Sequence, residues 1–350
     1  MTGLAPFGGW AGLLSEIVDG RDLTRDMAQA ALADILAGEA TPAQMAGLIV
    51  GLRLKGETTE ELTGLASAML AAAEPLRVPD ASIDIVGTGG SAYGRANALN
   101  ISTMACFVAA GAGATICKHG NRKASSTSGA FDFLEAIGVG IDMTPAQLEA
   151  CIAEYGLGFA FARTFHPSMR FVGPVRVELG IPTVFNVLGP LANPGRVTRQ
   201  VIGTTTVELA AKMAQTLQNL GSELAWVVSG DGGVDELTTT GPTTVFVVTP
   251  AAIDRIEIDA SAVGLAPVAS LTELEGGDPA ENARIFRAIL DGEEKGPRRD
   301  IVVLNAAAGL VVAGLADDLE AGVARSEAAL DDGRAAAKLA SLGTYSAALD

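Results

Sequence analysis

The chain has 350 residues, of which 49 % are hydrophobic and 19 % charged, a composition that can bury a large core and argues against disorder. Its 41 acidic residues outnumber its 24 basic ones, and the formal net charge is −17. Because nucleic acids and anionic membranes attract basic surfaces, neither is an expected partner.

The cysteines are odd in number and lack CxxC spacing, which favours buried, reduced thiols in a cytoplasmic protein at positions Cys106, Cys117 and Cys151. The N-terminal segment has neither a basic region nor a cleavage-like site, so no signal peptide is expected. The longest apolar stretches, 103–117 and 301–316, are too short or too interrupted to span a bilayer. We therefore expect a soluble protein.

Residues 10–74 are predicted to form helices only. Gly38 is a typical helix stop, and before it apolar residues recur at helical spacing at positions 27, 31, 32, 35 and 36. Thr41, which precedes a proline, predicts the start of the next helix. Thr58 and Glu61 have the spacing of a capping box at the start of another. This part of the chain is expected to be a small all-α domain.

From Ser82 the pattern changes to short β-rich runs that alternate with helical stretches. The β-rich runs are SIDIVG (82–87), GATICKHGN (113–121), LGFAFA (157–162), TVFNVL (183–188), QVIGTT (200–205), LAWVVSG (224–230) and TTVFVVTP (243–250). Helices are expected from NIST to about residue 112, over 128–139, and as a single packing helix from Asp317 onward. This alternation predicts an α/β domain with a mostly parallel central sheet flanked by helices. Its active site is expected at the carboxyl ends of the strands.

A glycine-rich loop, GTGGSAYGRANALNIST (87–103), follows the first predicted strand. A strand, a glycine-rich turn and a helix can present backbone N–H groups and a helix N-terminus to an anion. A nicotinamide site is disfavoured because Phe107 stands about where an acidic residue is expected. A purely structural turn remains an alternative, and a phosphate cradle is the favoured interpretation.

The next strand ends in a basic loop, KHGNRKASSTSG (118–129), which combines cations, an amide, hydroxyls and glycines. These groups suit phosphate binding at the same edge of the sheet, and the alternative is a solvated surface loop. His119 in this loop is equally compatible with a structural role and a functional one.

Two further segments carry candidate groups. Asp235 and Glu236 are adjacent in SGDGGVDELTTT (229–240), and their hard oxygens suit Mg²⁺ bound together with substrate phosphates. A turn with solvated acids is the alternative. Residues 165–194 contain His166 and Arg176, and an arginine is suited to binding a carboxylate in a bidentate manner. A surface helix with ordinary arginines would give the same pattern.

Together these segments resemble the anthranilate phosphoribosyltransferase family. The resemblance covers almost the whole chain through motifs in matching order: GLRLKGET (51–58), DIVGTGG (84–90), NIST (100–103), KHGNR (118–122), LEAIG (134–138), FHPSMR (165–170), PTVFNVLGPLANP (182–194), DELTTT (235–240), GGDPAENA (276–283) and LNAAAGL (304–310). It implies a small helical domain over about 1–75, completed by helices near 166–190. It also implies a large α/β domain over 76–350, and usually a homodimer formed through the helical domains.

The activity implied by the resemblance is the Mg²⁺-dependent transfer of a phosphoribosyl group from phosphoribosyl pyrophosphate to the amino group of anthranilate, in tryptophan biosynthesis. The implied donor-binding residues are Gly87, Gly90, Ser91, Arg95, Asn100, Ile101, Ser102, Thr103, Lys118, Asn121, Ser126 and Ala130. The implied anthranilate-binding residues are Gly87, Asn121, Arg176, His119 and His166. The implied Mg²⁺ ligands are Ser102, Asp235 and Glu236. No residue is assigned as an acid or base, because an arylamine is already nucleophilic.

The donor loop departs from the family pattern. Ser91 stands where the family has Asp, Ala98 where it has Thr, and the connection is longer by about three residues. Phe131 replaces what is typically alanine. In one interpretation Tyr93 and Arg95 of the longer loop bind the donor in place of the two altered residues. In a second the protein is a paralogue that acts on another aromatic acceptor or another donor, and in a third it is a non-catalytic relic of the fold.

Overall fold

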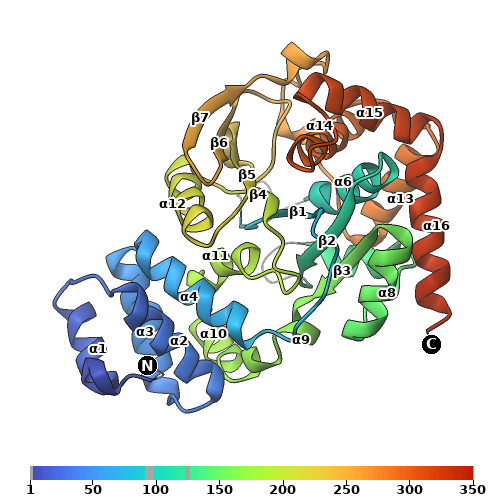
Figure 1. The fold of residues 1–350 in the computed structure, drawn as a ribbon. Coiled ribbons are helices and arrows are strands. Elements are labelled where there is room, and N and C mark those ends of the chain that lie inside the picture. Colours follow the sequence, from blue (N-terminus) through green and yellow to red (C-terminus); the bar gives the residue numbers. More distant parts are fainter. Residues whose placement is uncertain (1–2, 91–97, 123–126, 350) are drawn as a thin grey trace.

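The computed structural model describes residues 3–90, 98–122 and 127–349. Its N-terminal part is a helical unit, seen at the lower left of Figure 1, made of α1 (Gly9–Val18), α2 (Arg25–Ala37), α3 (Pro42–Lys55) and α4 (Thr59–Ala72). The predicted helix starts are confirmed. Thr41 and Thr58 each accept a hydrogen bond from the backbone three residues on, and Gln44 and Glu61 complete the two capping boxes.

The rest of the chain is built on a seven-stranded sheet in the order β3-β2-β1-β4-β5-β6-β7. Its strands are β1 (Ser82–Gly87), β2 (Thr115–Gly120), β3 (Leu157–Phe161), β4 (Arg199–Gly203), β5 (Leu224–Gly230), β6 (Thr243–Val248) and β7 (Ile253–Ile258). The first five of these are parallel, and β6 and β7 are added antiparallel at one edge. The expected mostly parallel sheet is thus confirmed, and β7 is an additional strand.

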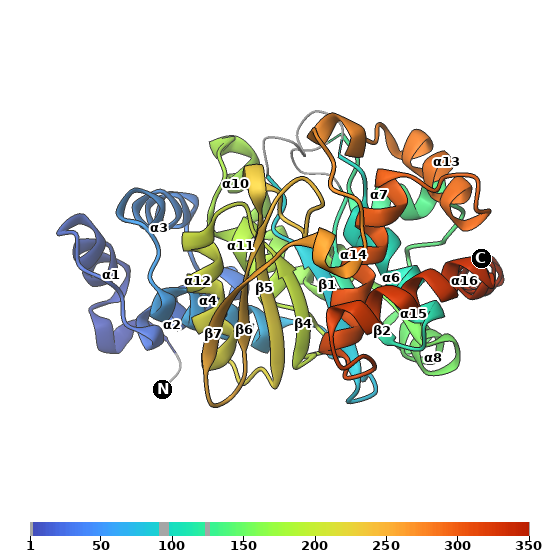
Figure 2. The same ribbon diagram turned by 90° about the horizontal axis from the view of Figure 1, so that it is seen from above.

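Helices cover both faces of the sheet (Figures 1 and 2). Helices α6 (Ile101–Gly111) and α14 (Pro297–Val312) pack on one face, and α11 (Val184–Leu191) and α12 (Val207–Asn219) pack on the other. In the described residues the other α-helices are α7 (Ala130–Ala136), α8 (Pro145–Tyr155), α9 (Ala162–Phe165), α10 (Gly173–Leu179), α13 (Pro279–Leu290), α15 (Leu319–Asp331) and α16 (Arg334–Ala347).

Two expectations about individual elements are wrong. Residues 183–188 form the start of helix α11 rather than a strand. Asn186 Oδ1 accepts from the Thr183 N–H at the start of this helix, and a short apolar run fits either structure. The C-terminal segment is two helices rather than one. The break lies at Gly333, whose left-handed φ of 79° does not continue a helix.

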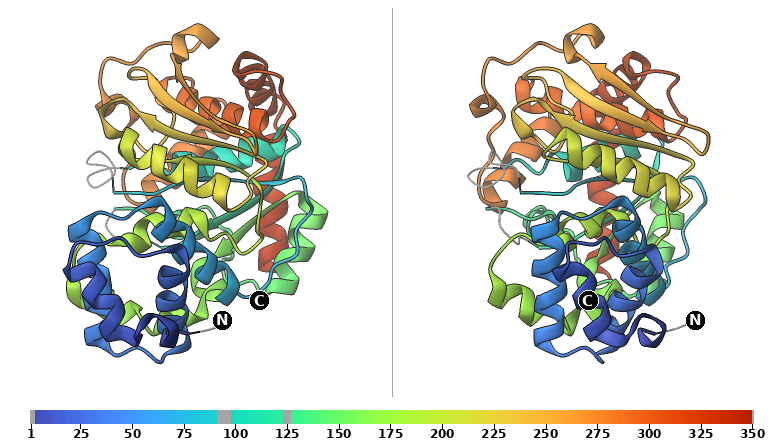
Figure 3. Two further views of the ribbon diagram at one scale, coloured as in Figure 1. Left: turned by 60° about the vertical axis from the view of Figure 1, so that its left-hand side comes forward. Right: turned by 90° about the vertical axis from the view of Figure 1, so that its left-hand side faces the viewer.

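The helical unit is continuous with one face of the sheet. Helices α10 and α11 contact α3, and α11 and α12 contact α4. One buried apolar cluster therefore extends from Leu13 in α1 through Leu188 in α11 to Val227 in β5. Figure 1 shows α11 between the helical unit and the sheet, and Figure 3 shows the helical unit below the sheet in two further views. Within the residues described, no helix is long and apolar enough to cross a membrane.

Candidate active site

The candidate site lies where the chain changes direction across the sheet. Strand β1 pairs with β2 on one side and with β4 on the other, so the connections after β1 and β4 diverge at this point. In sheets of this kind ligands bind in the crevice outside the carboxyl ends of such neighbouring strands. Gly87 ends β1 and is paired with Gly203, which ends β4.

The acidic loop that follows β5 packs directly over these two glycines. A Cβ on Gly87 would lie 2.6 Å from Asp235 Oδ2, and a Cβ on Gly203 would lie 1.6 Å from the Asp235 carbonyl oxygen. The backbone N–H of Gly89 donates to Asp235 Oδ2 at 2.6 Å. The two ends of this hydrogen bond are 146 residues apart in the sequence. They meet because Gly87 and Gly203 both lack a side chain.

The next two glycines are required by the backbone itself. Gly89 and Gly90 have φ values of 67° and 86°, in the left-handed region that side chains disfavour. A Cβ on either would meet nothing within 4 Å, so space does not explain them. The turn leaves Gly90 exposed at the end of β1, as expected of a loop that presents backbone N–H groups to an anion.

Asp235 and Glu236 form a concentrated negative charge. Asp235 is buried and Glu236 half-buried. Burial and the neighbouring charge of Asp235 raise the pKa of Glu236 well above its ordinary value, and Lys118 offsets part of this rise. A bound divalent cation would relieve that repulsion. Among the residues described, no three His, Cys, Asp or Glu side chains come together as a metal site. The pair therefore fits Mg²⁺ that takes further oxygens from a substrate, rather than an all-protein cage.

Lys118 is the cation that acts on this negative charge. Its side chain is 2 % exposed, and its ammonium donates to the Ile85 carbonyl and, at 3.4 Å, to the Ser102 hydroxyl. Ser102 lies in the first turn of α6, between the buried Ile101 and Thr103. The structure thus brings Lys118, Ser102 and Glu236 to one place.

Asn100 joins three segments of the protein. Its side-chain oxygen accepts from Ser128 and from Asn282, both at 2.8 Å, and its amide donates to the Ser128 carbonyl at 3.3 Å. Asn282 also donates to the Ala98 carbonyl. Ser128 and Asn282 were not among the predicted site residues. Their only signal was position, since Ser128 lies in the basic loop and Asn282 in the GGDPAENA motif.

The two histidines form a buried pair on the other face of the sheet. His119 and His166 have ring centroids 5.0 Å apart and are 4 % and 5 % exposed. His119 Nδ1 donates to the Gly189 carbonyl at 3.0 Å, and His119 Nε2 has no partner in the residues described. Burial, followed by the neighbouring His166, lowers the pKa of His119 to about 3, so His119 is neutral at physiological pH.

Arg176 lies in α10 with its guanidinium 5.0 Å from the ring centroid of Phe185 in α11. The side chain is half-buried, and burial lowers its pKa. Within the described residues it makes no ion pair, so its charge is available to an anion. Asn121 is exposed after β2, and its side-chain oxygen accepts from the Arg122 N–H at 2.8 Å. Ala130 begins α7, and the predicted residues Ser91, Arg95 and Ser126 lie outside the described residues.

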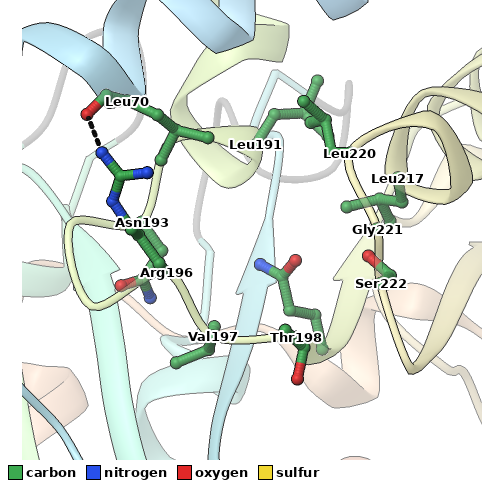
Figure 4. Close-up of a pocket in the computed structure, with 11 residues that line it drawn as sticks. Leu70, Leu191, Asn193, Arg196, Val197, Thr198, Leu217, Leu220, Gly221 and Ser222 are labelled. Atoms are coloured by element: carbon green, nitrogen blue, oxygen red, sulfur yellow. Dashed lines mark hydrogen bonds between the residues drawn. The ribbon is translucent and has the colours of Figure 1, made fainter.

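A cavity of about 120 Å³ lies at the opposite end of the sheet (Figure 4). It is lined by the connection from α11 to β4, by Leu70 of α4 and by the turn after α12. Arg196 in this connection donates to the Leu70 carbonyl at 2.9 Å (Figure 4). The cavity is therefore separate from the edge that carries Gly87, Lys118 and Asp235.

Comparisons with known proteins assign this arrangement to a family. Residues 11–73 match the helical bundle domain of the glycosyl transferase family, and residues 80–336 match its a/b domain. The chain is 48 % identical to anthranilate phosphoribosyltransferase of Rhodopseudomonas palustris (strain TIE-1) over 96 % of this chain and 98 % of that protein. It is 49 % identical to the enzyme of the same name from Roseiflexus castenholzii, over 95 % and 96 % of the two chains. The chain belongs to the anthranilate phosphoribosyltransferase family.

Solved structures of this family share the whole fold. The enzyme from Thermus thermophilus matches with a TM-score of 0.88 and 42 % identity, over 95 % of this chain and 98 % of that one. The enzyme from Saccharomyces cerevisiae, solved in complex with PRPP and Mg, matches with a TM-score of 0.88 and 27 % identity, over 97 % and 98 %. The family expected from the motifs and the combination of a helical unit with an α/β sheet are thus confirmed.

Proposed function

We propose that this protein is a transferase that moves the phosphoribosyl group of phosphoribosyl pyrophosphate to the amino group of anthranilate, giving N-(5-phosphoribosyl)anthranilate and pyrophosphate in tryptophan biosynthesis. Relatives that are 48 % and 49 % identical over nearly the full length carry this activity in their names. The structural observation that carries the proposal is the contact of Asp235 with the Gly89 amide, because it joins an acidic loop to a glycine-rich anion loop at the ligand-binding edge.

The donor would lie over the end of β1. We propose that it is held by the residues that the family resemblance implies: Gly87, Gly90, Ser91, Arg95, Asn100, Ile101, Ser102, Thr103, Lys118, Asn121, Ser126 and Ala130. The N–H of the exposed Gly90 and the buried Lys118 ammonium would stabilise the negative charge that grows on pyrophosphate as it leaves. Asn100 would act mainly by fixing the loop, since its side chain already bonds to Ser128 and Asn282.

Mg²⁺ would be held by Asp235, Glu236 and the hydroxyl of Ser102. When bound, this ion supplies Lewis-acid stabilisation of the pyrophosphate oxygens. The chain's own contribution is to place two carboxylates beside the glycine turn. Gly87 and Gly203 permit that placement because neither has a Cβ.

The acceptor would lie between α10, α11 and the end of β2. We propose that Arg176 binds the anthranilate carboxylate, with Asn121, His119, His166 and Gly87 around the ring. Support comes from the half-buried Arg176 guanidinium, which has no acidic partner among the residues described. Neutral histidines suit an arylamine acceptor, and the amine attacks the anomeric carbon as the bond from that carbon to the pyrophosphate oxygen breaks.

We further propose a division into a helical domain over 1–75, completed by the helices near 166–190, and an α/β domain over 76–350. The packing of α10 and α11 against α3 and α4 supports this division. A homodimer through the helical domain is also proposed, because Val18, Leu54 and Val177 on this unit are each more than 80 % exposed. Its oligomeric state can be measured by light scattering. Cytoplasmic location without nucleic-acid or membrane partners completes the proposal.

The activity can be tested by incubating the pure protein with phosphoribosyl pyrophosphate, Mg²⁺ and anthranilate and following the loss of anthranilate fluorescence. No turnover at saturating donor would refute the assignment. A screen of other aminobenzoates would then separate a paralogue with another acceptor from a relic. Arg95→Ala should mainly raise the donor KM if the longer loop binds the donor in place of the family's residues at positions 91 and 98. An unchanged donor KM would count against that compensation.

A further inference from the structure

The connection that follows α11 is tied to the sheet by one buried side chain, that of Asn193, which is 3 % exposed. Its amide donates to Asp84 Oδ2 in β1 and to the Cys117 carbonyl in β2, both at 2.8 Å. Its side-chain oxygen accepts from the Gly195 N–H at 2.9 Å. One residue thus joins the end of a helix to two neighbouring strands.

The end of α11 is held at three more points. The final carbonyls of a helix have no partner within the helix and must find one elsewhere. Here His119 donates to the Gly189 carbonyl, Gln200 to the Pro190 carbonyl at 3.1 Å, and His166 to the Ala192 carbonyl at 2.9 Å. The helix end therefore has a fixed position over β1, β2 and β4.

Helix α11 also determines where Arg176 lies. Phe185 on its first turn is 7 % exposed and supports the Arg176 guanidinium at 5.0 Å. A displacement of the α11 end relative to β2 would therefore move Arg176 relative to the end of that strand. The donor residues do not depend on α11. Side chains alternate along a strand, and Lys118, next to His119 in β2, contacts Ser102 of α6 on the opposite face of the sheet.

We propose that Asn193, anchored on Asp84, is a positioning residue for the acceptor: it fixes α11 against β1 and β2 and so sets Arg176 in register with the donor edge. This role rests on the proposed function. It goes beyond the residues assigned to either substrate, because the hydrogen bonds of Asn193 hold the end of α11 to β1 and β2.

A matched pair of variants tests this role. Asn305 in α14 is 1 % exposed, and its side chain makes three hydrogen bonds, two with the backbone of Leu237 and one with the Ile301 carbonyl. It therefore holds the residue next to Glu236 rather than α11. Asn193→Ala and Asn305→Ala remove the same side chain from equally buried sites that lie on opposite faces of the sheet.

Steady-state kinetics with anthranilate and phosphoribosyl pyrophosphate should separate the two variants. Asn193→Ala should raise the anthranilate KM about tenfold or more and leave the donor KM within about twofold, since misplacement by about 1 Å is costly in an active site. Asn305→Ala should raise the donor KM and leave the anthranilate KM within about twofold. Thermal unfolding of both variants measures the loss of stability that they share. If Asn193→Ala does not fold, Asn193→Ser replaces it and should give a smaller rise in the anthranilate KM.

If the unaltered protein turns over anthranilate but Asn193→Ala raises both KM values equally, or raises neither, the positioning role is overturned. The same holds if Asn305→Ala raises the anthranilate KM as much as Asn193→Ala does. Absence of turnover by the unaltered protein would instead remove the proposed function, and the positioning role with it.

Discussion

Asp84 predicts a pH dependence of stability that can be worked out from its surroundings. Its carboxyl is fully buried in the centre of the sheet, and Oδ1 has no partner in the residues described. Burial raises its pKa from 3.8 to about 6, and Lys118, Asn193 and the His119 N–H offset only part of that rise. The folded protein therefore binds this proton more tightly than the unfolded chain does. As a result, the contribution of Asp84 to the free energy of unfolding rises as the pH falls from 6 to 3.8.

The rise from 3.8 to about 6 corresponds to about 3 kcal/mol in total. Between about pH 8 and pH 5 the same two pKa values increase the free energy of unfolding by about 1.4 kcal/mol, and most of this increase comes below pH 6. Asp84→Asn cannot bind this proton, so it loses the gain. The melting temperature of the variant minus that of the unaltered protein should therefore fall by about 2 °C from about pH 8 to pH 5.

The comparison is insensitive to the other effects of the substitution. The asparagine side chain keeps an oxygen that can accept from Asn193 and from the His119 N–H, and its unpaired amide adds a cost that is the same at every pH. The other titrating groups are common to both proteins. Cys106 and Cys117 feel the Asp84 charge, but burial raises the pKa of both thiols far above this pH range, so their contribution to the difference does not change with pH here. Thermal unfolding of both proteins at about pH 8, 7, 6 and 5 provides the measurement. Melting temperatures that run parallel over this range would show that Asp84 is not protonated with a raised pKa, and would refute the reasoning.

Three further predictions concern the site. Asp235→Asn and Glu236→Gln should each raise the Mg²⁺ concentration needed for half-maximal turnover, and an unchanged Mg²⁺ titration would exclude the pair as ligands. Arg176→Ala should raise the anthranilate KM about 10- to 100-fold, because it removes a charge-assisted hydrogen bond to the carboxylate. Arg170→Ala is the control: it also removes an arginine next to a phenylalanine ring, and it should leave the anthranilate KM near the original value. Gly203→Ala should yield little folded protein because its Cβ would overlap the Asp235 carbonyl, whereas Gly173→Ala, with nothing within 4 Å, should fold normally; equal yields would contradict this.

Local signals in the sequence were sufficient for most elements of the fold. Thr41 and Thr58 cap helices where their spacing indicates, and the β-rich runs that begin near residues 82, 113 and 157 are parallel strands. The run at 183–188 was misassigned because its apolar side chains are buried between the helical unit and the sheet. Helix and strand patterns look alike in such surroundings, and only the capping pair Thr183 and Asn186 distinguishes them.

The candidate site could be predicted as a location but not as a set of contacts. The rule that ligands bind at the carboxyl ends of parallel strands places the glycine turn, Lys118 and Asp235 at one edge. The pairing of Asp235 with Gly89 spans 146 residues, and that of Asn193 with Asp84 spans 109, so no local spacing encodes either contact. His119 illustrates the limit, because its burial against His166 and Gly189 arises only when three distant segments meet.

The glycine turn shows how one motif satisfies separate physical requirements. Gly87 has no left-handed backbone, and it is glycine because the Asp235 carboxylate occupies the space of a Cβ. Gly89 and Gly90 have open space around them, and they are glycine because of their positive φ. The first position therefore brings the acidic loop to the turn, and the next two give the turn its shape. A carboxylate held on the Gly89 amide places the proposed metal ligand beside the proposed pyrophosphate cradle, so the two charges that must be balanced during transfer meet on one turn.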